Sequence, residues 1–216
     1  RRSVFQPHLF SEDEIRRLLT ASLQRRRGAK PISRWCRYTV FGLLSVTGMR
    51  VSEALNLDLE DIDLEEGVLT IRNSKFGKSR LVPLHPSTCA ILRWYRERRD
   101  EFLAGRCVAA FFVSPLGGRV KHSVMHKSFV RLSRKLGLRG ASDAQGPRFH
   151  DLRHTMAVEV LRQCYLTGAD PERRLPALST YLGHTHLTYT YWYLHQNPSL
   201  MTQAVTRLEH HWEASA

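Results

Sequence analysis

The chain has 216 residues, 42% hydrophobic and 25% charged, a balance typical of a soluble globular protein and not of a disordered one. Lysine and arginine total 33 against 20 aspartate and glutamate residues, so the net charge is +13 and a polyanionic partner is the simplest explanation. No apolar run approaches the roughly 18 residues that a membrane-spanning helix needs, so a membrane partner is not expected.

The first predicted helix covers about residues 11–27. Ser11 is followed three residues later by Glu14, the pattern of a capping box, and apolar residues recur behind it at helical spacing. A second, mostly apolar helix is predicted over 32–47. Gly48 is expected to end it, because glycine readily adopts the left-handed conformation common at helix ends.

A short helix over 51–57 and then a β-hairpin over about 68–84 are predicted next. Val68–Arg72 and RLVPL read as its strands, and the polar, glycine-containing run NSKFGKS between them gives the hairpin a basic tip. Further helices are predicted over 86–103, 123–136, 151–166, 176–182 and 199–213. The predicted fold class is therefore mainly α with a small antiparallel β-sheet (α+β), in a single domain over 1–216.

The cysteines bear on the compartment and on metal binding. They are widely spaced and form no CxxC pair, which favours a reduced, intracellular protein without a disulfide framework or structural zinc. They are Cys36, Cys89, Cys107 and Cys164.

Arg50 in the segment TGMRVSEALNL is the first candidate for chemistry. It follows a glycine-terminated apolar helix, and Glu53 lies three residues further on. A half-buried arginine is costly unless it is paired, so Glu53 could form a purely structural ion pair with it.

Two more segments carry candidate residues. In FHDLRHT, His150 and Arg153 stand three positions apart, so on a helix they share a face and could converge on one ligand, or could simply be a solvated surface pair. The segment YLGHTHLTYTYWYL supplies His184 and a group of tyrosines of a kind that more often serves core packing. These are Tyr189, Tyr191 and Tyr193.

In order and spacing, these motifs resemble the tyrosine recombinases, a family that includes phage integrases and bacterial recombinases that resolve chromosome dimers. The matching features are TGxRxSExxxL, a basic hairpin ending in RLVPL, HxLRHT, LGH, and a tyrosine nine residues after His184. The resemblance runs from about residue 9 to 210. It implies the catalytic-domain fold of that family and site-specific DNA breakage and rejoining through a 3′-phosphotyrosine, without metal, ATP or another cofactor.

The resemblance also implies roles for single residues. Arg50, His150, Arg153 and His184 match catalytic positions, and Glu53 matches the acidic residue that supports the first arginine.

The nucleophile and the hairpin lysine are assigned by offset. Tyr193 matches the nucleophile by its distance from LGH, with Tyr191 as a competitor, and Lys75 matches the lysine when aligned backward from RLVPL. Lys78 is the lesser candidate for that lysine. Contact with DNA is expected of three basic residues: Lys78, Arg80 and Arg148.

Phosphodiester chemistry makes sense of these residue types independently of the resemblance. Charge gathers on the non-bridging oxygens of a pentavalent phosphorus, and planar arginine forks stabilise it well. A tyrosine with an ordinary pKa near 10 must lose its proton, for which His150 is the candidate base. Lys75 can protonate the leaving 5′ oxygen. No GxxxxGK[ST] loop is present, in agreement with a reaction that needs no ATP.

The predicted C-terminal helix over 199–213 has apolar residues on one face. It either packs on its own core or, as the resemblance implies, docks on a neighbouring protomer of a tetramer assembled on paired sites in double-stranded DNA. No small-molecule substrate is expected, and the protein is predicted to be encoded by a bacterium or a phage and to lie in the cytoplasm, associated with the nucleoid. The apolar residues of the helix are Leu200, Met201, Ala204, Val205, Leu208 and Trp212.

Two other functions compete with recombination. A type IB topoisomerase uses closely similar chemistry as a monomer, and a non-catalytic DNA-binding protein would need none of the catalytic residues. Most tyrosine recombinases also carry an N-terminal helical domain that clamps the other face of the DNA. That domain is expected to be absent or to lie outside this chain.

Overall fold

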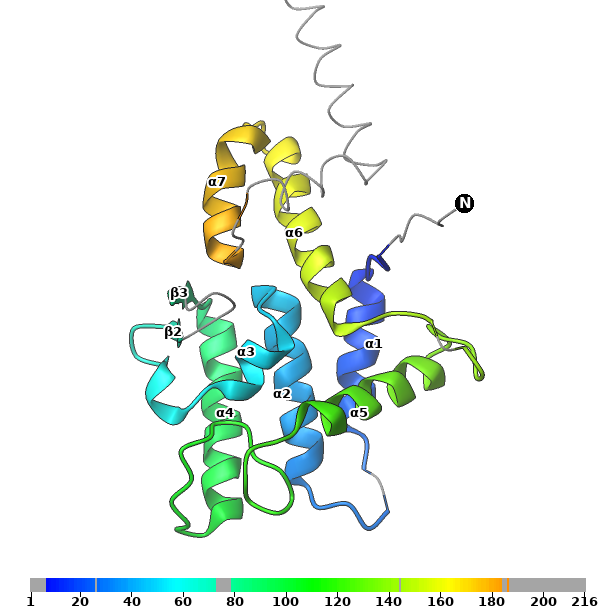
Figure 1. The fold of residues 1–216 in the computed structure, drawn as a ribbon, viewed down its shortest axis with the longest axis vertical. Helices are drawn as coiled ribbons and strands as arrows, with labels where there is room; N and C mark the ends of the chain where they lie inside the picture. Colours follow the sequence, from blue (N-terminus) through cyan, green and yellow to red (C-terminus); the bar gives the residue numbers. More distant parts are fainter. Residues whose placement is uncertain (1–6, 26, 73–78, 144, 184–185, 187–216) are drawn as a thin grey trace, which may run out of the picture.

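The computed structural model describes residues 7–25, 27–72, 79–143, 145–183 and 186. Helices dominate it, and a small sheet lies at one side (Figure 1). The α-helices are α1 (Glu12–Leu23), α2 (Ile32–Thr47), α3 (Val51–Asn56), α4 (Pro86–Leu103), α5 (His122–Lys135), α6 (Phe149–Leu166) and α7 (Pro171–Leu182). The sheet strands are β1 (Ile62–Asp63), β2 (Val68–Ile71) and β3 (Arg80–Pro83), and a 3₁₀ helix (Leu59–Asp61) precedes β1.

The predicted fold class is confirmed, and several helix bounds agree closely with the sequence. The structure places α2 and α4 at the predicted residues, and the capping box at Ser11 is present, with the Glu14 amide donating to the Ser11 hydroxyl over 3.2 Å. Gly48 ends α2 in the left-handed conformation at φ 59°. The first helix, however, stops at Leu23. Residue 24 already has extended backbone, three residues before the predicted end of the helix at about residue 27.

The last described helix begins earlier than predicted. α7 starts at Pro171 and not at residue 176, because Asp170 caps it and proline is well suited to the first helical position. Pro176 inside the helix obscured this start in the sequence. The predicted helix over 199–213 lies outside the described residues.

The core is built around α2, which packs against α1, α4 and α6 (Figure 1). Three phenylalanines from different elements meet there: Phe41 of α2 lies 5.7 Å from Phe129 of α5 and 5.6 Å from Phe149 of α6 between ring centroids. A smaller apolar cluster joins α6 to α7, where Leu161 and Leu182 are fully buried. The start of α6 and the end of α7 are thereby fixed relative to the end of α2.

The sheet is antiparallel in the order β1-β2-β3, and its β2–β3 pair confirms the predicted hairpin strands. Ile71 pairs with Arg80 at the end of the ladder nearest the joining segment. Strand β3 alternates, with Leu81 64% exposed and Val82 buried, so Arg80 shares the inward side with Val82. None of the helices in the described part of the chain is both long and apolar enough to cross a membrane.

Candidate active site

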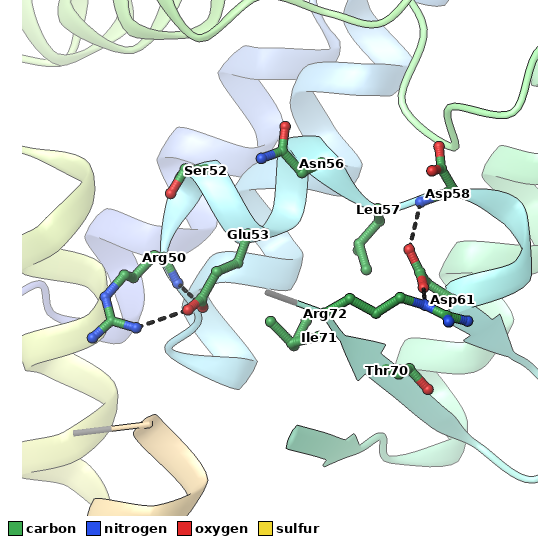
Figure 2. Close-up of a pocket in the computed structure, with 10 residues that line it drawn as sticks. All are labelled: Arg50, Ser52, Glu53, Asn56, Leu57, Asp58, Asp61, Thr70, Ile71 and Arg72. Carbon is green, nitrogen blue, oxygen red and sulfur yellow. Dashed lines mark hydrogen bonds and ion pairs between the residues drawn. The ribbon is translucent and has the colours of Figure 1, made fainter. Parts of the chain in front are cut away.

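Arg50 and Glu53 form the first part of the site, at the start of α3. Glu53 accepts two hydrogen bonds from Arg50, one from its backbone amide over 2.9 Å and one from Nη1 over 2.8 Å (Figure 2). The Glu53 side chain is buried, while that of Arg50 is 25% exposed. The predicted pairing is therefore present, and the arginine that it holds is partly exposed to solvent.

A pocket of about 560 Å³ adjoins Arg50 between α3 and β2 (Figure 2). At the end of the pocket away from Arg50, Arg72 donates to Asp61 over 2.5 Å. Three carboxylates line the pocket, and each accepts a hydrogen bond from an arginine. Glu53 is bonded to Arg50 and Asp61 to Arg72, as described, and Asp58 is bonded to Arg119. The acidic groups of the pocket are therefore neutralised locally.

Arg153 is buried at the junction of three helices. Its Nη1 donates to the Gly48 carbonyl over 2.9 Å, and its Nη2 donates to the Leu182 carbonyl over 2.6 Å. Both acceptors lie at helix C-termini, where the aligned peptide dipoles favour a positive charge. These bonds tie α6 to the ends of α2 and α7.

The two arginines predicted from distant motifs meet at the end of α7. Arg50 Nη2 donates to the Gly183 carbonyl over 3.3 Å, beside the Leu182 carbonyl that Arg153 contacts. Consecutive carbonyls thus receive side chains that are 103 positions apart in sequence. His184, another predicted site residue, follows directly in the chain.

His150 lies in the first turn of α6 and keeps solvent exposure. Its pKa is lowered from the ordinary 6.5, first because its ring is partly desolvated and second because the Arg153 charge is close, with Arg50 also contributing. The His154 ring lies edge-on at 4.5 Å. At neutral pH, His150 is consequently a neutral imidazole that can accept a proton.

Arg148 and Arg80 were both expected to contact DNA, and the structure places them differently. Arg148 precedes α6 with its side chain 47% exposed, 3.5 Å from Asp151. Arg80 is only 10% exposed and donates to both oxygens of Glu53, over 3.0 and 2.8 Å. DNA contact by Arg148 stays a prediction, whereas Arg80 faces the protein interior.

The remaining predicted residues lie outside the described part of the chain: Lys75, Lys78, His184 and Tyr193. In sequence, both lysines belong to the segment joining β2 to β3, and His184 follows Gly183. Arg80, the first residue after the joining segment, contacts Glu53, and Gly183, which precedes His184, contacts Arg50.

Arg119 is a residue of the site's scaffold that sequence reasoning missed. Its Nη1 donates to the carbonyls of Leu55 and Leu57 over 2.9 and 3.1 Å, and its Nη2 contacts Asp58. Arg119 thereby holds the C-terminal end of α3, the helix that begins after Arg50. No sequence motif marks it, because its partners are backbone carbonyls about 60 positions away.

Comparison with known proteins finds similarity along nearly the whole chain. The profile of the phage integrase family matches residues 8–199. The putative integrase/recombinase y4rB of Sinorhizobium fredii (strain NBRC 101917 / NGR234) is 50% identical over 211 residues, which is 96% of this chain and 67% of that protein.

Two solved structures are also similar. The crystal structure of XerA recombinase superposes with a TM-score of 0.71 at 28% identity, covering 96% of this chain and 65% of that one. A lambda integrase tetramer bound to a Holliday junction gives a TM-score of 0.62 at 20% identity, covering 89% of this chain and 49% of that one. The chain thus spans about two thirds of the first two proteins and about half of the third.

Proposed function

The chain belongs to the phage integrase family, and from this membership we propose that it is a tyrosine-type site-specific recombinase or integrase. It would cleave and rejoin double-stranded DNA through a 3′-phosphotyrosine, without metal or ATP. The observation that carries the proposal is the meeting of Arg50 and Arg153 at the end of α7, beside a neutral His150. This arrangement suits a phosphate diester in an in-line displacement.

The arginines stabilise the charge that develops on phosphorus. Arg50 makes a long contact with Gly183 and is partly exposed, so its fork can turn onto a non-bridging phosphate oxygen. Arg153 is fixed by two carbonyls and supplies a positive charge that needs no rearrangement during the reaction. His184 completes the set of groups around the phosphate.

Proton transfer is divided among three side chains. Tyr193 attacks phosphorus and forms the phosphotyrosine bond while its proton passes to His150. The bond from phosphorus to the 5′ oxygen breaks, and Lys75 supplies the proton that this oxygen takes up. Resealing reverses these steps, with His150 returning its proton to the tyrosine.

We further propose that the protein works as a tetramer on paired DNA sites. The lambda integrase structure is a tetramer on a Holliday junction, and the predicted apolar helix over 199–213 provides a means of linking protomers. The place of the protein is the cytoplasm, at the nucleoid.

A two-site plasmid assay tests this function. After footprinting locates the binding site on the source DNA, a plasmid carrying two copies is incubated with the protein in excess EDTA. Recombinant circles are expected, because arginines do the work that metal ions do in many nucleases. Relaxation without recombinants would favour a topoisomerase, and activity that EDTA abolishes and magnesium restores would contradict the mechanism.

A further inference from the structure

We propose that Arg80 is a positioning residue that balances the charge of Glu53, so that Glu53 can orient Arg50 without cancelling the charge that Arg50 offers to the phosphate. This inference rests on the proposed function only for the identity of the phosphate. It replaces direct DNA contact as the role of Arg80.

Each of the three guanidinium nitrogens of Arg80 donates a hydrogen bond within the protein. Nη1 and Nη2 donate to the two oxygens of Glu53 over 3.0 and 2.8 Å, and Nε donates to the Tyr181 carbonyl over 2.9 Å. The planar fork thus meets the carboxylate in the bidentate geometry that makes such pairs strong and specific. The first residue of β3 is thereby joined to α3 and to the last turn of α7.

The end of α7 also covers the guanidinium. Gly183 has φ +68°, and a Cβ atom built on it would lie only 3.0 Å from Nη1 of Arg80. Arg80 is therefore enclosed between the Glu53 carboxylate and the Gly183 backbone. A phosphate would have to displace one of them to reach it.

The charge count explains why two arginines share one carboxylate. Burial opposes ionisation of Glu53, but hydrogen bonds from Arg80 and Arg50 outweigh it and hold the pKa at about 2, so the group is ionised at neutral pH. A buried pair of Glu53 and Arg50 alone would be neutral. With Arg80 the trio has a net charge of +1, and the exposed member, Arg50, can present it to an anion.

This account predicts an unusual order of activities among four proteins. Arg80→Gln leaves Glu53 paired with Arg50 alone and so cancels the charge that Arg50 offers, and covalent cleavage should fall roughly 100-fold, as on loss of one donor to the transition state. Adding Glu53→Gln removes the carboxylate that now cancels Arg50, so the double variant should cleave faster than Arg80→Gln. Arg80→Lys keeps the charge but loses the fork, and should lie between the wild type and Arg80→Gln.

DNA binding distinguishes this role from direct contact. Affinity falls with salt, and loss of one phosphate contact reduces the magnitude of the slope of log affinity against log salt concentration by about 0.9. We expect that change for Arg148→Gln and no change in slope for Arg80→Gln on the same duplex. Arg96→Gln, which removes an exposed arginine of α4, controls for the loss of one positive charge. Thermal unfolding of each variant shows whether the fold is kept.

The outcomes separate the two proposals. A double variant no faster than Arg80→Gln, or a salt slope lowered by about 0.9 in Arg80→Gln, would overturn charge balancing. If wild-type protein forms no covalent adduct, the recombinase function fails, and the affinity series then decides the role of Arg80. Should Arg80→Gln unfold, the same comparison is made between Arg80→Met, which also removes the charge, and its double variant with Glu53→Gln.

Discussion

Arg50 and Arg153 both place positive charge at the site, but Arg50 is partly exposed and Arg153 is buried. Replacing each with lysine distinguishes its contribution to catalysis from its contribution to stability. Lysine keeps the charge but loses the planar fork, with which Arg50 can bind the phosphate and by which Arg153 is held in position, so each Arg→Lys change should cost roughly 3–4 kcal/mol in the cleavage step. Gel-shift affinity should fall much less. A fully active Arg50→Lys protein would mean that the pair with Glu53 is structural only.

Thermal unfolding should distinguish the same two variants. Arg153 is 1% exposed and serves the carbonyls of Gly48 and Leu182, so its replacement leaves buried acceptors without partners. We expect a loss of about 1–3 kcal/mol per lost bond for Arg153→Lys and a smaller loss for the more exposed Arg50→Lys. Equal losses would contradict the difference in burial.

His150 should set the acid side of the pH profile. Its pKa lies below 6.5 in the folded protein, so the neutral form persists as pH falls and is lost only below that value. The second-order rate of cleavage, which reports the free protein, should therefore stay level through pH 6.5 and decline below it. His150→Gln should cleave slowly without this decline. A limb centred above pH 6.5 in the wild type would exclude His150 as the base.

The contacts of some site residues could be predicted from the sequence, and those of others could not. The partner of Arg50 was predictable because Glu53 is only three positions away on one helix. The inward position of Arg80 had a signal, the alternation of β3, but a basic residue beside a basic hairpin tip reads first as a DNA contact. Arg119 had none, since its bonds go to backbone carbonyls that only the tertiary fold brings near.

Among the elements, local signals decided which bounds were predictable. Gly48 and the capping box at Ser11 are short-range features, and the structure confirms both. The start of α7 was misjudged because Pro176 normally breaks a helix, although Asp170 and Pro171 form a good beginning. The convergence of α2, α6 and α7 depends on packing across the core, which periodicity alone does not specify.

The predicted C-terminal helix gives a test at the scale of an element. Deleting residues 199–216 should leave DNA binding by single protomers near the wild-type level and weaken assembly on two-site DNA. Native mass spectrometry of complexes with one-site and two-site duplexes measures both, and cleavage is scored separately because Tyr193 lies close to the truncation. Full-strength assembly without this segment would rule it out as the link between protomers.

The molecule as a whole combines a net charge of +13 with a site assembled from segments far apart in the chain. α3, the hairpin, α6 and the end of α7 each contribute side chains or carbonyls, and α2 at the centre packs against α3 and α6 (Figure 1). Charge and motif order predicted a DNA-processing enzyme of this fold. The pairing of Arg80 with Glu53, which sets the charge around Arg50, could be seen only in the three-dimensional structure.

The central claim, cleavage by a tyrosine nucleophile, is tested most directly by trapping the covalent intermediate. A nicked suicide substrate carrying the footprinted site is incubated with wild-type, Tyr193→Phe and Tyr191→Phe proteins, and adducts are separated by denaturing electrophoresis. The account predicts an adduct with the wild type and with Tyr191→Phe, and none with Tyr193→Phe, which should still bind the DNA. An adduct that persists in Tyr193→Phe and disappears in Tyr191→Phe would move the nucleophile, and no adduct with any protein would contradict the account.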